Sequence, residues 1–329
     1  MSSVLAAAPA ADNAASGKVA EATVAARQNF PKRSRLRINP YVWYVIPGVL
    51  AFLVVIGGSF GATIYTSFTT WNGLGTAKFV GLKNYITLMG DEVFWQSFLH
   101  AGVFVVTMAL IPSALGLFVA ALLFDYIAPR FGARISAAMR AMFFVPQIIP
   151  ITVSGVLWVW LLSPNDGVIN TILRNIGASN VALNWLGDPR YAIWAVSAML
   201  IWIQIGYSIV IFMSGLSRLD PSLSEAAQLD GASWFQRFRM ITFFQVRPEL
   251  SVVLLTTTVA ALKVFAPVYV MTQGGPGNAT TVPAFFSYYQ FFTTTKVGYG
   301  SAVATVLALI LTVIAIVILN VQNRQGDNK

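Results

Sequence analysis

Six separate stretches of this sequence are apolar over at least 20 residues, and they limit the possible folds more than any other feature. A helix needs about 20 mostly apolar residues to cross the roughly 30 Å hydrocarbon core of a bilayer. Only 10% of the chain is charged, against about 25% in an ordinary soluble domain. We therefore expect an all-α integral membrane protein with six transmembrane helices. The predicted spans are Tyr41–Phe68, Phe94–Phe124, Ala141–Leu162, Tyr191–Leu216, Leu250–Met271 and Gly300–Leu319.

The distribution of positive charge predicts the orientation of these spans. Fifteen of the 21 Lys and Arg residues lie in the two tails and in the connections after spans two and four, and only five lie in the other connections. Because Lys and Arg are enriched in cytoplasmic connections, both termini are expected to be cytoplasmic. The net charge of +9 is therefore assigned to membrane topology, and nucleic acid is not expected as a partner.

The two ends of the chain are expected to lie outside the bilayer. Residues 1–40 are predicted to be a disordered basic tail, since they are rich in Ala and carry a cluster of Lys and Arg next to the first span. Residues 41–320 hold the six spans, and residues 321–329 form a short cytoplasmic tail.

Several chemistries are excluded by the residues that the chain lacks. There is no Cys and His100 is the only His, which excludes disulfides, cysteine nucleophiles and multi-histidine metal sites. No Asp or Glu falls inside a predicted span, which disfavours an ion-coupled transporter or a membrane enzyme with paired titratable groups. Lys263 either reaches an interface or faces a cavity. A G-x-x-x-x-G-K-[ST] phosphate-binding loop is also missing, so an ATPase would have to be a separate polypeptide.

The connection between spans four and five, residues 218–247, has the clearest local pattern. Ser222–Glu225 follows a proline and has capping-box spacing, which Ser233–Gln236 repeats. Gly231 stands between them, where a helix typically ends. We expect two short helices that form a rigid cytoplasmic knob. From these residues alone, the knob docks either in a groove of a partner protein or flat on the bilayer.

This connection resembles the EAA motif of ABC importer permeases. Glu225-Ala226-Ala227 is followed after three residues by Gly231 and after nine more by Ile241, although Phe243-Phe244 replaces the Leu-Pro that continues the motif. In that family the segment is a coupling helix that inserts into a cleft of the cytoplasmic ATPase. The resemblance implies ATPase-coupling roles for Glu225, Ala226, Ala227, Asp230 and Gly231.

Further motifs are similar to those of the carbohydrate-type permeases and follow in the same order over about 280 residues. The Gly-Gly-Pro sequence resembles the external loop of the maltose-permease-like first subunit, so the resemblance implies that Gly274, Gly275 and Pro276 face a solute-binding protein. The motifs are Trp71-Asn72, Phe79 to Tyr85, Phe143-Phe144-Val145-Pro146, Asp166 to Asn170, Trp185-Leu186-Gly187-Asp188-Pro189, Thr272 to Thr280 and Gly298 to Ala302.

The resemblance also implies an assembly and a function. A type I ABC importer of the bacterial inner membrane pairs such a chain with a second permease subunit, two ATPase subunits and an extracytoplasmic binding protein. ATP and magnesium would bind the ATPase subunits, and no cofactor is expected on this chain. The implied cargo is a mono-, di- or oligosaccharide, with glycerol-3-phosphate or another polyol-like solute as the alternative.

The substrate path is expected to use spans three, four and five. Pro146 and Pro150 free backbone carbonyls in span three. Aromatic, amide and glycine residues in span four suit a sugar, and small residues in span five recur at helical spacing. For each of these residues the alternative is ordinary helix packing. The candidate residues are Gln147, Ile151, Ile203, Gln204, Gly206, Tyr207, Thr257, Ala261 and Val264.

Overall fold

The computed structural model describes residues 42–326, so the predicted tail 1–40 and the last three residues lie outside the described part. The chain divides into two units, residues 1–59 and residues 60–329. The first unit contributes α2 (Val42–Phe52), the π-helical turn η1 (Leu53–Gly57) and the start of α3 (Gly58–Ser67). Its described side chains are mostly exposed and apolar, as expected for a helix that faces lipid.

The second unit is helical apart from one two-residue strand pair, β1 (Thr69–Thr70) and β2 (Lys78–Phe79), which run antiparallel. The helices in chain order are α4 (Lys83–Met89), α5 (Glu92–Val105), η2 (Val106–Leu110), α6 (Ile111–Leu122), η3 (Leu123–Ile127), α7 (Ala128–Phe131), α8 (Ala133–Ile148), α9 (Ile151–Leu161), α10 (Val168–Asn175), η4 (Ser179–Val181), α11 (Ala192–Leu216), α12 (Pro221–Leu229), α13 (Trp234–Arg237), η5 (Phe238–Thr242), α14 (Phe243–Gln245), α15 (Arg247–Leu262), α16 (Ala266–Met271), α17 (Pro283–Tyr288), η6 (Tyr289–Thr293) and α18 (Val297–Gly326).

Four helices in the described part are long and apolar enough to cross a membrane: Trp43–Ser67, Glu92–Phe131, Ala192–Leu216 and Val297–Val317. They coincide with predicted spans one, two, four and six. A fifth crossing is present if α8 and α9 are counted as one bent span. The count of six crossings therefore stays a prediction. The helix of predicted span two continues through Asp125 to Phe131, and α18 continues to Gly326, beyond the predicted end of span six.

Predicted span three is not a continuous helix, which corrects the sequence interpretation. α8 begins at Ala133, before the predicted start, and the chain bends by 95° before α9. The physical cause is Pro150, because the residue before a proline is driven out of helical geometry. Ile149 accordingly has extended backbone angles, with φ −70° and ψ 130°.

Predicted span five is also interrupted. α15 ends at Leu262, and the chain leaves helical geometry before α16 begins with Pro267 in its first turn. Proline suits that position because its missing N–H needs no partner there. Val264 lies in this interruption, so it does not continue the helical face of Thr257 and Ala261 as the spacing had indicated. Lys263 lies at the same break and is exposed.

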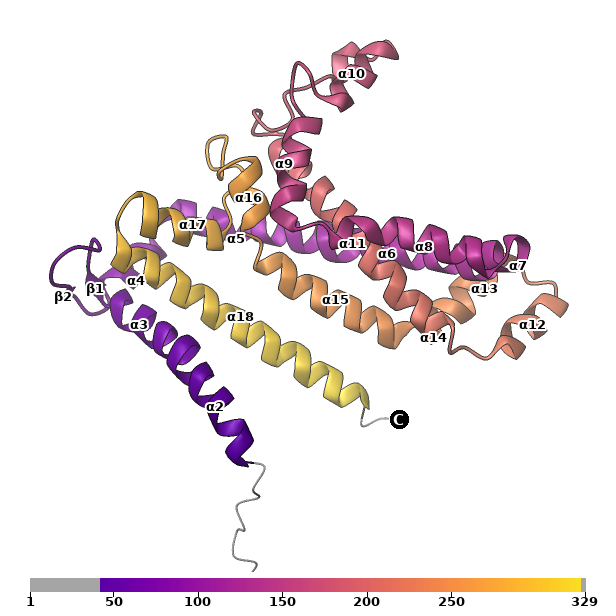
Figure 1. Cartoon of the computed structure of the whole chain (residues 1–329), viewed down its shortest axis with the longest axis horizontal. Coiled ribbons are helices and arrows are strands. Elements are labelled where there is room, and N and C mark those ends of the chain that lie inside the picture. Colours follow the sequence, from indigo (N-terminus) through magenta and orange to yellow (C-terminus); the bar gives the residue numbers. More distant parts are fainter. Residues whose placement is uncertain (1–41, 327–329) are drawn as a thin grey trace, which may run out of the picture. The chain divides into compact units, whose positions relative to one another are not determined.

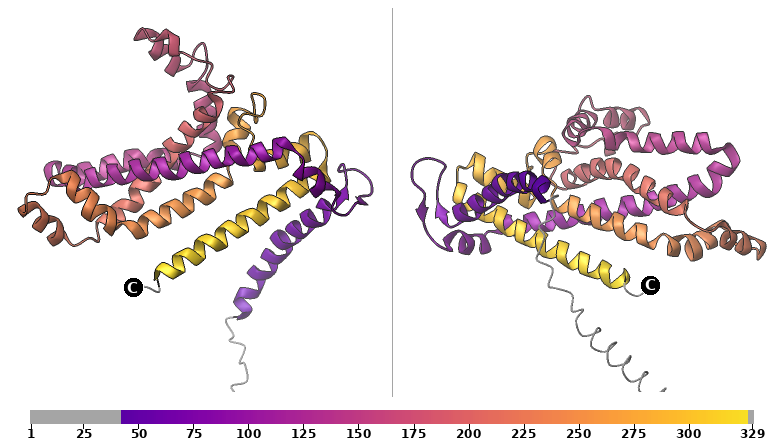
Figure 2. Two further views of the ribbon diagram at one scale, coloured as in Figure 1. Left: turned by 180° about the vertical axis from the view of Figure 1, so that it is seen from behind. Right: turned by 60° about the horizontal axis from the view of Figure 1, so that its bottom comes forward.

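Close contacts between small residues hold the long helices together. α11 packs against α6 and α8, and it crosses them obliquely in the left view of Figure 2. A Cβ on Gly116 would lie 2.5 Å from the Cβ of Ser208, and one on Gly206 would lie 2.3 Å from the carbonyl oxygen of Phe143. Glycine permits this approach, as is common between membrane helices. Gly206 is thus a packing residue within this chain.

Three apolar clusters of described residues fill the second unit. They lie around Phe104 and Leu200, around Phe212 and Val246, and around Phe94 and Val303. Figure 1 shows α12 and α13 at one end of this unit and α4 and α17 at the opposite end. The predicted coupling loop and the predicted external loops are thereby separated by the length of the helices.

Candidate functional site

The predicted coupling loop folds as two short helices, α12 and α13, joined at a glycine. Gly231 has φ +81°, and the amides of Gly231 and Ala232 bond the carbonyls of Gln228 and Ala227. This pattern is a Schellman motif, in which a left-handed residue ends the helix and satisfies its last carbonyl groups. The predicted helix–glycine–helix arrangement is confirmed.

The two predicted capping boxes have different outcomes. Ser233 and Gln236 form the predicted box around the start of α13. Ser222 does not cap α12. Instead, the carboxylate of Asp220 accepts the backbone N–H of Ser222 at 2.9 Å, because Pro221 supplies the first helical residue and moves the cap one position upstream of it.

An aromatic group anchors α13 to the long helix of span two. The indole Nε1 of Trp234 donates to Asp125 Oδ2 at 3.2 Å. The Trp234 ring stacks on Phe238 with centroids 5.4 Å apart, and Phe118 of α6 meets it edge-on. Because the stacked rings and the indole hydrogen bond restrict rotation, this contact fixes α13 against α6 and η3.

Arg237 fixes α12 to α13. Its Nη1 donates to Gln228 Oε1 at 2.8 Å and to the carbonyl of Ser224 at 3.5 Å. Trp234, which bonds the helix of span two, and Arg237, which bonds α12, both belong to α13. The short helix α13 therefore connects α12 to the helix of span two. The sequence interpretation missed both Asp125 and Arg237. An acid directly after Phe124, followed by further apolar residues, was the available signal.

The remaining surface of α12 is exposed. Glu225, Ala226, Asp230 and Gly231 are all exposed, and Ala227 is half-buried. Apolar side chains accompany them, and Leu229 is 89% exposed. Large exposed apolar side chains beside small residues are typical of a protein-binding surface. The structure thus brings the five predicted coupling residues together on one exposed segment.

The entry into α15 bends without the Leu-Pro pair of the EAA motif. Val246 leaves helical geometry with φ −90° and ψ 12°, and Pro248 stands in the first turn of α15. Arg218 Nη2 and Glu249 Oε1 are 2.5 Å apart, which ties the end of α11 to this turn. Phe243-Phe244 therefore does not remove the bend. The proline is supplied five residues after Phe243.

The predicted path residues of span three flank the 95° break. Gln147 is half-buried, and its Oε1 is buried without a hydrogen-bond partner among the described residues. Ile151 begins α9 and is 38% exposed. An unpaired buried amide oxygen is costly unless another group completes it. Gln147 and Ile151 are thus the predicted path residues with free surface at a helix break.

The predicted path residues of spans four and five are mainly buried within this chain. Ile203 and Gln204 are each 7% exposed, Thr257 is fully buried, and Ala261 and Val264 are at most 5% exposed. Thr257 Oγ1 donates to the carbonyl of Val253 at 2.7 Å. Tyr207 is half-buried, and its hydroxyl contacts Thr256 Oγ1 at 3.1 Å, linking α11 to α15.

The Gly-Gly-Pro loop is folded tightly onto the helices. Gly274 is buried with φ +78°, and its carbonyl accepts the hydroxyl of Thr281 at 3.0 Å. The carbonyl of Gly275 accepts the hydroxyl of Thr280 at 2.9 Å. His100 of α5 contacts the carbonyl of Thr281 through Nδ1 at 2.9 Å. Gly275 and Pro276 are half-buried, so this loop presents a fixed surface.

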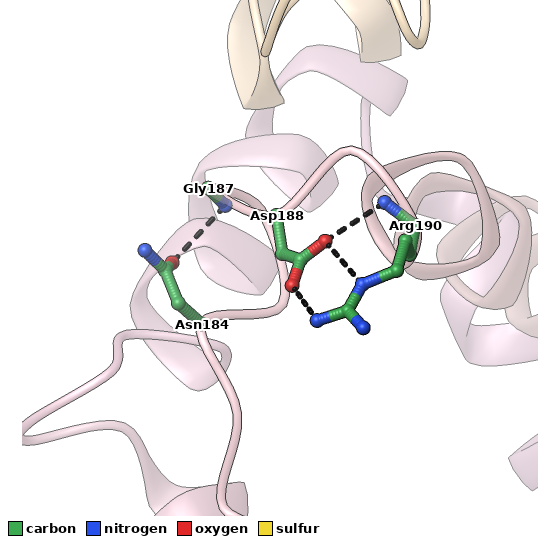
Figure 3. Close-up of polar contacts among 4 residues, drawn as sticks. All are labelled: Asn184, Gly187, Asp188 and Arg190. Carbon is green, nitrogen blue, oxygen red and sulfur yellow. Dashed lines mark hydrogen bonds and ion pairs between the residues drawn. The ribbon is translucent and has the colours of Figure 1, made fainter.

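The other predicted external loop, between α9 and α11, is held by side chains. Asn170 bonds the carbonyls of Pro164 and Leu183, and Trp185 Nε1 donates to Asn170 Oδ1 at 2.7 Å. Figure 3 shows Asp188 turned toward the guanidinium of Arg190, with the closest pair of atoms 2.7 Å apart. Asn184 accepts the backbone N–H of Gly187 in the same view.

Two carboxyl groups in these segments have perturbed acidity. The backbone N–H of Ser222 holds the pKa of Asp220 below its ordinary value. Hydrogen bonds from the Arg190 side chain hold the pKa of Asp188 below its ordinary value. In both cases a donor stabilises the charged form. Among the described residues, no group of three or more His, Asp or Glu side chains is placed to hold a metal ion.

The fold is similar to that of a solved bacterial importer. The crystal structure of a bacterial alginate ABC transporter, in complex with an alginate pentasaccharide-bound periplasmic protein, contains a chain that matches with a TM-score of 0.73. The match covers 86% of this chain and 94% of that chain at 20% sequence identity. This likeness supports the permease fold.

Sequence comparison gives the family. A trehalose/maltose transport system permease protein of Thermococcus litoralis is 31% identical over 280 residues, which is 85% of this chain and 91% of that protein. A probable starch degradation products transport system permease protein of Thermoanaerobacterium thermosulfurigenes is 31% identical, over 84% of this chain and 92% of its own length. Residues 130–325 match the family described as binding-protein-dependent transport system inner membrane component. The chain therefore belongs to this family of ABC transporter permeases.

Proposed function

We propose that this chain is the first membrane subunit of a heterodimeric ABC importer and forms half of the path that carries a sugar across the bacterial cytoplasmic membrane. A second permease subunit supplies the other half. Two ATPase subunits bind ATP and magnesium on the cytoplasmic side, and a solute-binding protein delivers the sugar from outside. Both termini are cytoplasmic in this arrangement, as the distribution of Lys and Arg indicates.

The observation that carries this proposal is that the coupling segment is exposed on one face and held to the rest of the chain by side-chain hydrogen bonds on the other. Glu225 and its neighbours offer a docking surface, while Trp234 bonds Asp125 and Arg237 bonds Gln228 behind it. A force applied to α12 is thereby passed to the helix of span two. A segment lying flat on the bilayer would not need this pinning, so the structure favours docking to a protein.

The class of cargo is inferred from the relatives and from the charges. Relatives are named for transport of trehalose and maltose and of starch degradation products. A phosphate cargo calls for a cluster of basic residues, and Lys263 is the only Lys or Arg within the predicted spans. A neutral saccharide is therefore favoured over glycerol-3-phosphate.

The substrate contacts are proposed to begin at the break in span three. Gln147 has an unpaired amide oxygen that can accept a sugar hydroxyl, and Ile151 is exposed beside it. Tyr207 lies half-buried on α11. Ile203, Gln204, Thr257, Ala261 and Val264 are buried in this conformation, so they would reach a sugar only after α11 and α15 move apart.

The coupling role is tested with Glu225→Lys in the assembled transporter. We expect the variant to insert normally but to copurify with the ATPase several-fold less well and to lose sugar uptake to a similar extent, because the charge of the docking surface is reversed. Copurification and radiolabelled sugar uptake in proteoliposomes measure both effects.

A matched control is Glu92→Lys, which reverses an equally exposed acid at the start of α5. It should leave copurification and uptake near the wild-type levels. Normal uptake by Glu225→Lys, or equal losses in the two variants, would contradict the coupling role.

A further inference from the structure

A polar cavity lies in the second unit, at the end opposite α12. Its volume is about 640 Å³, which is within the range of small-molecule binding sites. Its walls come from the β1–β2 hairpin, α4, the start of α5, η6 with the connection that follows it, and the first turn of α18. None of the predicted path residues lines it. The side chains that matter here are Trp71, Asn72, Lys78, Asp91, Gln290, Lys296 and Tyr299.

The walls of this cavity are braced by hydrogen bonds across the chain. The backbone N–H of Gly298 donates to the carbonyl of Trp71 at 3.1 Å, which closes the hairpin onto α18. Asn84 donates to the carbonyls of Ser67 and Thr69 at 2.8 Å each. The indole of Trp71 donates to the carbonyl of Gly75 at 3.1 Å. The cavity is thus preformed, which lowers the entropic cost of binding.

The side-chain carbonyl and carboxylate oxygens of Asn72, Asp91 and Gln290 in the cavity already accept hydrogen bonds within the protein. Asp91 Oδ1 accepts two backbone N–H groups at the start of α5, and Oδ2 accepts the hydroxyl of Tyr299 at 2.6 Å. Asn72 Oδ1 accepts the N–H of Leu74, and Gln290 Oε1 accepts the hydroxyl of Thr294. The single carboxylate of the cavity is therefore occupied on both oxygens.

The donor groups, in contrast, are free in the described part of the chain. Lys78 and Lys296 are exposed and take part in neither of the two described ion pairs. The side-chain amides of Asn72 and Gln290 donate no hydrogen bond between described residues. A cavity with free donors, two unpaired cations and occupied acceptors favours a ligand that is rich in acceptors and negatively charged.

Two aromatic side chains complete the lining. Trp71 and Tyr299 are both half-buried, so part of each side chain stays accessible. Aromatic faces pack against the apolar faces of sugar rings, and neighbouring amides bond sugar hydroxyls. Aromatic side chains beside amide groups favour a sugar over a simple inorganic anion, because an inorganic anion has no ring that could pack against the indole.

We propose that this cavity is a second binding site, separate from the translocation path, for a saccharide that carries a carboxylate. The ring packs on Trp71, the amides of Asn72 and Gln290 bind hydroxyls, and the carboxylate lies by Lys78 and Lys296. The inference goes beyond the proposed function, since the cavity needs neither the ATPase nor the second permease subunit to form.

The test is calorimetric titration of the full chain in lipid nanodiscs with digalacturonic acid, at low and at physiological salt. Digalacturonic acid should bind saturably, and lactose, a neutral disaccharide, should bind much more weakly. The double variant Lys78→Met/Lys296→Met should weaken digalacturonate binding about tenfold or more, because hydrogen bonds between charged groups are the strong ones. Added salt should weaken the wild-type complex, since exposed charges are screened.

The matched control is Lys83→Met, which removes an exposed lysine that begins α4 next to Asn84 but does not line the cavity. It should bind digalacturonate like the wild type. The proposal is overturned if lactose binds equally well, if the double variant binds normally, or if no saturable binding occurs. Preferential binding of a hexaglutamate peptide would also overturn it, because the cavity would then fit an acidic segment of a partner protein. A failure of uptake does not affect this result, which needs no transport.

Discussion

The coupling segment and the Gly-Gly-Pro loop are both short connections that turn at a left-handed glycine, yet they are held in opposite ways. Gly231 is exposed and a Cβ there would meet nothing within 4 Å, whereas Gly274 is buried against Phe285 and Thr281. The coupling segment is held from behind by the side chains of Trp234 and Arg237, and its outer face is left exposed. The Gly-Gly-Pro loop is held by threonine hydroxyls that bond the carbonyls of Gly274 and Gly275.

This difference separates a moving part from a fixed surface. A segment pinned through Trp234 and Arg237 can shift as one piece with the helix of span two while its outer face stays free. A loop whose carbonyls are bonded inward changes shape only by breaking those bonds. We therefore expect the coupling segment to transmit motion and the Gly-Gly-Pro loop to give a partner a surface of constant shape.

The largest effect is expected from Gly231→Val. Valine in left-handed geometry costs roughly 1–2 kcal/mol, and the junction between α12 and α13 would relax by changing its angle. We expect normal insertion, with ATP-driven uptake lowered about tenfold or more. Uptake in proteoliposomes and membrane insertion by fractionation measure these quantities.

Gly177→Val is the control for backbone strain, because Gly177 has the same φ of +81° but lies in the connection after α10, away from the coupling segment. Its uptake should stay near that of the wild type. Equal losses in the two variants would mean that strain anywhere impairs the transporter, and the proposed difference between the two regions would be lost.

A smaller effect is expected from Gly274→Ala in the external loop. The added Cβ would lie 2.5 Å from the Phe285 ring and 2.7 Å from Thr281 Oγ1. The loop should be displaced, lowering the melting temperature and reducing several-fold the stimulation of ATPase activity by the binding protein. Differential scanning fluorimetry and an ATPase assay with and without the binding protein measure the two effects.

Gly277→Ala is the partner variant, since Gly277 has φ +56° but a Cβ there would meet nothing within 4 Å. Gly277→Ala has only the conformational cost of a positive φ and no clash of the added Cβ. It should therefore change the stimulation of ATPase activity by the binding protein only slightly. If both variants behave alike, the buried contact at Gly274 does not hold the loop in shape.

The smallest effect is a pH dependence that distinguishes the two regions. The pKa values of Asp220 and Asp188 are lowered in the folded chain, so their stabilisation is present above their ordinary value of 3.8. It is lost as pH falls through the lower folded values. Salt should weaken the Asp188 contribution, which depends on Arg190, more than that of Asp220, which depends mainly on a backbone N–H.

Melting temperatures of Asp220→Asn and Asp188→Asn, relative to the wild type, test this at pH 6 and pH 3 with and without added salt. The difference from the wild type should shrink at pH 3 for both. If the melting-temperature difference between Asp188→Asn and the wild type does not change with salt, Asp188 stabilises the loop through packing and not through its charge.

The sequence predicted the parts of the fold that depend on local pattern. Length and apolarity located the helices of spans one, two, four and six, and capping chemistry predicted the box of Ser233 and Gln236. The resemblance to the EAA motif pointed to Glu225 and its neighbours, which the structure leaves mostly exposed, and their coupling role stays a prediction. These features depend on neighbours within a few residues, which is the range that a sequence pattern reports.

Features that depend on tertiary contacts were not predictable. Nothing near Gly206 in the sequence indicates that the carbonyl of Phe143 fills the space of its missing side chain. The cavity near Trp71 is closed by Gly298, more than 200 residues away along the chain. Pro150 was recognised as a residue that interrupts the backbone hydrogen bonds of span three, but the sequence does not specify the angle of 95° between α8 and α9.

The π-helical turns have a consequence for how such a chain tolerates changes in length. Five are present in the described residues, at 53–57, 106–110, 123–127, 238–242 and 289–293. Each holds about one residue more than an α-helical turn, so losing that residue would restore the regular ladder and leave the helix beyond it in nearly the same orientation. A deletion in a regular α-helical turn would instead rotate everything beyond it by about 100°. At 238–242, a single deleted residue would therefore be absorbed without rotating α13 relative to α14. The chain thus carries, between the coupling segment and the membrane helix that follows, a place where its length can change by one residue.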